Sequence, residues 1–144
     1  MLRTILGVII GYVLMFAATF GLWFVAMGSE WAFEPGSWEA SDVWLLISFG
    51  ANLVIGIISG FICVLIAKST RAPLTLAVVV FALGIVFAIP AIVAQESATS
   101  LVRRGEFSQV EAMEHAREPL WAPFTVPFIG ALGVLVGGKL KKQT

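Results

Sequence analysis

Residues 43–67 read VWLLISFGANLVIGIISGFICVLIA, a run of 25 residues without a charged side chain. As an α-helix that rises about 1.5 Å per residue, this run extends roughly 37 Å and exceeds the ~30 Å hydrocarbon core of a bilayer. The run is continuously apolar and lacks the two-residue alternation of a membrane β-strand. It therefore predicts a transmembrane helix.

Three further apolar runs, over residues 4–27, 73–94 and 120–138, have the same character. The whole chain is 59% hydrophobic with a mean hydropathy of +0.97, which is far outside the range of a soluble domain. The first run is longer than the roughly 7–15 apolar residues of a signal peptide, so we expect a retained helix. The sequence predicts an all-α membrane protein: a four-transmembrane-helix antiparallel bundle that forms a single integral membrane domain over residues 1–144.

Charged residues are segregated along the chain although the net charge is zero. The acidic residues lie in two connections: Glu30, Glu34, Glu39, Asp42, Glu96, Glu106, Glu111, Glu114 and Glu118. Most basic residues lie at the two termini and in the second connection: Arg3, Lys68, Arg71, Lys139, Lys141 and Lys142, against Arg103, Arg104 and Arg117 in the third connection. Short loops rich in Lys and Arg stay in the cytoplasm. We therefore expect a multi-pass protein of the plasma (inner) membrane with cytoplasmic N- and C-termini and both acidic loops outside.

Small residues recur at four-residue spacing in every apolar run, which allows helix backbones to approach closely in lipid. The candidate packing residues are Gly7, Gly11, Gly56, Gly60, Gly84, Gly133 and Gly137. Asn52, a full amide near mid-depth, is expected to form an interhelical hydrogen bond worth about 1 kcal/mol. Packing within one chain is the favoured interpretation, and a homo-oligomer face is the alternative.

Prolines interrupt the third and fourth apolar runs at Pro90, Pro123 and Pro127. A proline inside a helix frees the carbonyl four residues earlier, which here would be those of Val86, Pro119 and Pro123. Lipid cannot satisfy such groups. We expect the outer halves of these two helices to hold a cavity or a simple kink.

The third connection contains the pattern of a short amphipathic helix over residues 108–117. Ser108 and Glu111 have the spacing of a capping box, and Val110, Met113 and Ala116 would form an apolar stripe. Three carboxylates and the single histidine would share one face: Glu111, Glu114, His115 and Glu118. Such a set is a candidate metal site, because Glu and His bind transition metals in four-helix carboxylate proteins. The alternative is a solvated acidic face that pairs with Arg117.

The first acidic loop is unusually aromatic. Trp31, Phe33, Trp38 and Trp44 fall within fourteen residues, and Trp121 stands at the start of the last run. Such rings suit the headgroup layer of a bilayer. Because Trp is enriched at binding hot spots, the second interpretation is a docking surface for a partner.

The apolar runs contain no Asp, Glu, Lys, Arg or His in their interior, which argues against a pump. The chain also lacks nucleotide, zinc and hydrolase motifs. We expect a small polytopic membrane protein without catalytic chemistry or cofactor that acts as an accessory subunit or interaction scaffold in a membrane complex. Its partners would be the lipid bilayer and a protein or second copy, not nucleic acid. The alternatives are an oligomeric channel or facilitator for a small solute, and a membrane enzyme that uses Glu114 and His115.

Overall fold

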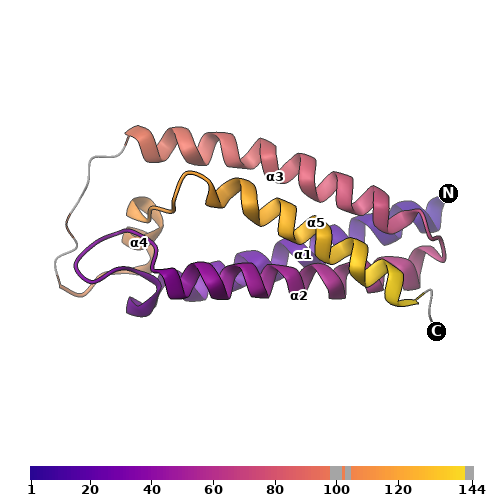
Figure 1. Cartoon of the computed structure of the whole chain (residues 1–144), viewed down its shortest axis with the longest axis horizontal. Coiled ribbons are helices and arrows are strands. Elements are labelled where there is room, and N and C mark those ends of the chain that lie inside the picture. The colour runs from indigo at the N-terminus through magenta and orange to yellow at the C-terminus, as the bar shows by residue number, and fades with distance from the viewer. Residues whose placement is uncertain (98–101, 103–104, 142–144) are drawn as a thin grey trace.

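The computed structural model describes residues 1–97, 102 and 105–141, except the side chains of residues 96 and 97. Arg103, Arg104 and Lys142, which contributed to the predicted orientation, lie outside the described residues, as does the side chain of Glu96. Within the described ranges the chain forms helices and no strand (Figure 1). The elements in order are α1 (Leu2–Met27), η1 (Glu30–Ala32), α2 (Asp42–Ala67), α3 (Ala72–Ser97), α4 (Gln109–His115) and α5 (Ala122–Leu140).

Four of these helices, α1, α2, α3 and α5, are long and apolar enough to cross a membrane. The predicted all-helical, multi-pass membrane protein is confirmed at this level. The last helix begins two residues later than predicted, at Ala122, so Pro123 falls in its first turn, where a missing N–H is tolerated. The carbonyl of Pro119 is not freed, because it accepts a hydrogen bond of 2.8 Å from the Ala122 amide.

The long helices run alternately in opposite directions, so the start of α1 and the end of α5 lie at one end of the molecule (Figure 1). We call this the terminal end, which also contains the turn at residues 68–71. The opposite end, called the loop end, contains η1, α4 and the connections around them.

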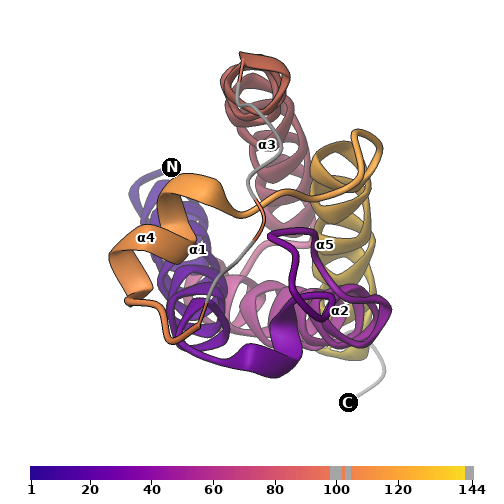
Figure 2. The same cartoon turned by 90° about the vertical axis from the view of Figure 1, so that its left-hand side faces the viewer.

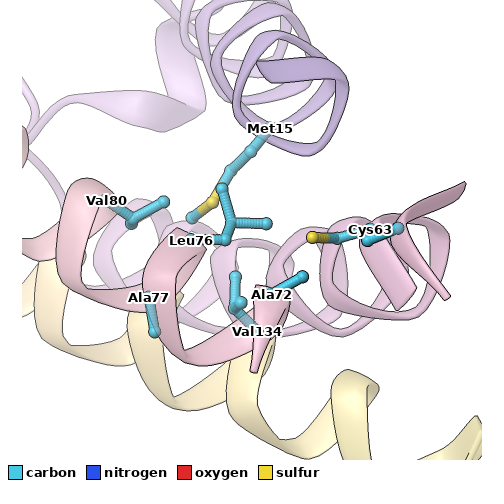
Figure 3. Packing of buried hydrophobic residues seen from close by; sticks show 8 residues of the cluster. Met15, Cys63, Ala72, Leu76, Ala77, Val80 and Val134 are labelled. Carbon is cyan, nitrogen blue, oxygen red and sulfur yellow. The ribbon is translucent and has the colours of Figure 1, made fainter. Parts of the chain in front are cut away.

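The half of the molecule nearer the terminal end is closely packed. Glycines bring α2 and α5 into main-chain contact: a Cβ on Gly56 would lie 2.6 Å from the Gly130 carbonyl oxygen, and one on Gly60 would overlap the Val134 main chain. Met15 of α1, Leu76 of α3 and Val134 of α5 meet beside this contact (Figure 3). Every predicted packing glycine lies against another helix of the same chain: Gly7, Gly11, Gly56, Gly60, Gly84, Gly133 and Gly137.

Helix α3 separates from the other helices toward the loop end (Figures 1 and 2). Although a turn of only four residues joins α2 to α3, α3 packs mainly on α5. Gly84 lies directly against the ring of Pro127. Pro90 stands further along α3, in its diverging part. The divergence opens the interior of the molecule on the side of the loop end.

Candidate site at the loop end

The first loop and the third connection are joined by main-chain hydrogen bonds at Arg117. The Arg117 amide donates to the Trp38 carbonyl at 2.8 Å, and the Ala40 amide donates to the Arg117 carbonyl at 2.7 Å. Glu39 and Arg117 thereby form an isolated parallel bridge. Ala116 has φ −56° and ψ 134°, so the chain leaves the helix before it reaches this bridge. This explains why α4 ends at His115 rather than at the predicted residue 117.

Helix α4 starts as predicted, because the Ser108 hydroxyl accepts the Glu111 amide at 3.2 Å. The predicted apolar stripe does not form its packed face. Val110 is 66% exposed and Met113 is also exposed, whereas Ala112 is fully buried. The small side chain of Ala112 packs in the buried cluster at the loop end of α1.

The four candidate metal ligands do not share one face. Glu111 and Glu114 are exposed on α4, the His115 ring packs 5.6 Å from the Trp38 ring, and Glu118 follows the bridge at Arg117. The predicted one-face arrangement is therefore wrong, because the helix stops three residues before Glu118. Among the described residues, no group of three His, Cys, Asp or Glu side chains is placed to hold a metal ion.

The aromatic residues of the first loop form an internal cluster. The rings of Phe33, Trp38 and Phe107 meet edge to face, with centroids 5.3–5.7 Å apart. Such pairs stabilise beyond their buried area. Phe33, Trp38 and Trp44 are buried, which corrects their interpretation as a docking surface. Trp31 and Trp121, the other two candidates, remain exposed.

A cavity of about 410 Å³ lies under this cluster, between α1, α2, α3 and α5. This volume falls within the ~300–1,000 Å³ of small-molecule sites. Aromatic rings of α1, including Phe16 and Phe20, line one wall, and the small residues Ala88 and Ala91 of α3 line the opposite wall. Phe16 and Phe20 of α1 and Phe87 of α3 line the cavity and are also exposed, so the cavity is open to the outside of the bundle between α1 and α3. It occupies the helix halves in which the prolines predicted a cavity or a kink.

Polar groups line the cavity on the α1 and α2 side. The Thr19 hydroxyl donates to Asn52 Oδ1 at 3.1 Å, and Asn52 Nδ2 donates to the Ser48 carbonyl at 2.8 Å. Asn52 thus joins α1 to α2, the role expected for it in the sequence. Because Thr19 pairs with Oδ1 of Asn52 and the Ser48 carbonyl pairs with Nδ2, both ends of the Asn52 amide have a partner.

Glu118 stands at the mouth of the cavity and is half-buried. Its Oε1 accepts a hydrogen bond of 3.3 Å from the Trp44 indole Nε1. Trp44 is held in place at the start of α2, where its amide donates to the Ser41 hydroxyl at 3.1 Å. Burial raises the pKa of the Glu118 carboxyl above its ordinary value, and the hydrogen bond from Trp44 lowers it in part.

A second, charged pocket of about 550 Å³ adjoins the cavity, and we call it the vestibule. It shares Gln95 and Glu118 with the cavity, so the two spaces meet at these residues. Its charged lining residues are Glu34, Glu39, Asp42, Arg117 and Glu118. Arg117 Nη2 is buried and has no hydrogen-bond partner among the described residues.

Sequence reasoning did not identify this combination. The alternative interpretation paired Arg117 with the acidic face that included Glu118. Arg117 and Glu118 do line the vestibule together, but with Glu34 and Glu39 of the first loop and Asp42 at the start of α2 rather than with Glu111 and Glu114. The signal in the sequence that could have indicated this site is the run of Arg117, Glu118 and Pro119, which places two opposite charges next to each other between two predicted helices. No protein-family model, curated protein or solved structure matches this chain.

Proposed function

We propose that this chain is an antiparallel four-helix membrane bundle that binds an amphiphilic molecule in the cavity, in a non-catalytic, accessory role. The observation that carries the proposal is the junction of an apolar cavity with a charged vestibule at Glu118. A ligand that spans this junction needs an apolar body and a polar head. Most ligand sites combine an apolar lining with a few placed polar groups in this way.

The charge distribution supports an orientation with the loop end outside the plasma membrane. The basic residues next to the start of α1, in the turn between α2 and α3, and at the end of α5 all belong to the terminal end, which the positive-inside rule assigns to the cytoplasm: Arg3, Lys68, Arg71, Lys139 and Lys141. The mouth and the vestibule then lie at the level of the outer headgroups. A molecule of the outer leaflet enters between α1 and α3 without crossing the membrane.

Binding is favoured over conduction because the cavity ends inside the membrane. A smaller pocket of about 130 Å³ extends the cavity as far as Tyr12, Met15 and Val80. Beyond it, Leu76 packs in the buried cluster with Cys63 and Val134 (Figure 3). Helices α2 and α5 also touch at their glycines. Binding is favoured over catalysis because Glu114 and His115 line neither the cavity nor the vestibule. In its accessory role, the chain would hold the bound ligand for a partner protein or for a second copy of itself in the same membrane.

The test is the binding of a single-chain fluorescent amphiphile to the full-length protein in nanodiscs, with fluorescence transfer from tryptophan as the signal. Ala91→Phe places a ring in the cavity and should weaken binding about tenfold. Ala82→Phe adds the same ring on an exposed part of α3 that lines no described pocket, and should leave binding unchanged. Equal affinities of the two variants and the unmodified protein would contradict the proposal.

A further inference from the structure

We infer that the ligand is a glycerophospholipid of the outer leaflet with a primary-ammonium zwitterionic head, that is, a phosphoethanolamine lipid. One of its two acyl chains occupies the cavity and the other remains in the bilayer beside the opening between α1 and α3. Its phosphate contacts Arg117, and its ammonium contacts the carboxylates of Glu39 and Asp42. This inference rests on the proposed function, because it names the ligand of the same cavity.

The anionic part of the head is assigned from Arg117. Its main chain is held on both sides, by the bonds to Trp38 and Ala40, so the position of the residue is set. Its side chain lines the vestibule, yet Nη2 lacks an acceptor among the described residues. A buried donor without a partner costs about 1–3 kcal/mol, and more when it is charged. A phosphate in the vestibule supplies the missing acceptors once the partly exposed Arg117 side chain turns Nη2 toward the pocket, because the guanidinium fork matches phosphate oxygens in pairs.

The cationic part of the head is assigned from the surrounding carboxylates. Glu34, Glu39 and Asp42 line the same pocket as Arg117. With Glu118, four carboxylates and one guanidinium line this pocket, so its excess charge is negative: the carboxylates attract a cationic group and repel an anionic one except beside Arg117. A head with both charges matches both. A primary ammonium donates three hydrogen bonds to carboxylates, as a lysine does, whereas a quaternary choline donates none.

The position of the apolar part of the lipid follows from the junction of the cavity with the vestibule. Gln95 and Glu118 border both the vestibule and the cavity, so a head in the vestibule leads its chain directly under the aromatic cluster. The opening between α1 and α3, beside Phe16 and Phe87, faces the bilayer. A lipid therefore enters sideways with its head already at the outer surface.

The experiment is native mass spectrometry of the full-length protein in detergent, titrated with three lipids that carry identical chains. The heads are phosphoethanolamine, phosphocholine and phosphoglycerol. The phosphoethanolamine lipid should bind at least tenfold more tightly than either of the others. Arg117→Gln should weaken it about tenfold, whereas Arg71→Gln, an exposed arginine at the terminal end, should have no effect.

A second variant keeps the test valid if Arg117→Gln does not fold. Glu39→Gln combined with Asp42→Asn should remove the preference for phosphoethanolamine over phosphoglycerol, while both lipids still bind. Equal binding of phosphocholine and phosphoethanolamine lipids would overturn the ammonium assignment. If free phosphoethanolamine, which has no acyl chain, displaced the bound lipid as well as an intact phosphoethanolamine lipid does, the placement of an acyl chain in the cavity would be wrong.

The two proposals fail in different ways. If the three lipids bind alike and Ala91→Phe weakens all of them, the cavity binds amphiphiles and the head assignment is wrong. If neither the lipids nor the fluorescent amphiphile bind, the proposed function itself is wrong and the head assignment falls with it.

Discussion

The indole Nε1 of Trp44 lies 3.3 Å from Oε1 of Glu118, although 74 residues separate them in the chain. This hydrogen bond connects the first turn of α2 to the segment before α5. It holds the carboxyl at the border between the apolar cavity and the charged vestibule. A buried tryptophan donor rarely lacks a partner, so the bond also satisfies an indole that is 1% exposed.

The raised pKa of Glu118 predicts a specific pH dependence of stability. Folding favours the neutral carboxyl, so its contribution is fully present below about pH 4 and is lost as the pH rises through the folded-state pKa. The difference in melting temperature between the unmodified protein and Glu118→Gln should therefore fall between pH 4 and pH 7. Circular dichroism melts in detergent measure it.

Two variants test the cause of that pH dependence. Glu114→Gln removes an exposed carboxyl of the same connection and should leave the pH profile unchanged. Trp44→Phe removes the hydrogen bond that lowers the pKa, so the loss of stability should extend to higher pH. A flat difference between the unmodified protein and Glu118→Gln over the whole range would show that Glu118 has no raised pKa.

Gly60→Ala should destabilise the protein by about 1–3 kcal/mol, because overpacking of a close contact costs this much. The added Cβ would overlap the main chain of Val134 in α5. Gly50→Ala, on the same helix, meets nothing within 4 Å and should cost nothing, since Ala is the better helix former. Unfolding by SDS in mixed micelles compares the two. Similar losses for both variants would contradict the close α2–α5 contact.

Thr19→Val should cost about 0.6–1.7 kcal/mol, the range of hydrogen bonds between membrane helices. The substitution removes the donor to Asn52 Oδ1 and keeps the shape of the side chain. A double-mutant cycle with Asn52→Leu isolates the pair. A coupling energy near zero would mean that the bond between α1 and α2 does not contribute to stability.

The orientation predicted from the basic residues is tested with two reporters. A fusion after Thr144 should report the cytoplasm. An insertion at Pro35-Gly36 should report the exterior, and the turn should accept it because Gly36 has φ +72° and open space around it. A cytoplasmic signal from the insertion would reverse the orientation. The vestibule would then face the inner leaflet.

Local patterns in the sequence were sufficient for the four membrane helices and for the start of α4. A continuous apolar run predicts a helix in lipid without knowledge of its neighbours, because its backbone N–H and C=O groups must form hydrogen bonds within the segment itself. The Ser108 cap was predictable for the same reason, since it involves a residue only three positions away. The sequence also contained the segregation of charge, from which the orientation remains a prediction.

The tertiary structure decided which residues meet. Arg117 forms a bridge with the first loop, which ends α4 early and separates Glu118 from Glu111, Glu114 and His115. Phe33, Trp38 and Trp44 looked like surface aromatics but are buried in one cluster, in which Phe107 of the third connection covers the rings of Phe33 and Trp38. The cavity formed where α3 diverges from α5 beyond Gly84. The sequence by itself determined where the helices form, because a helix depends on interactions between residues a few positions apart, and it determined where the charges fall along the chain. The cavity, the vestibule and the position of Glu118 depend on contacts between residues as far as 74 positions apart, which no local pattern encodes.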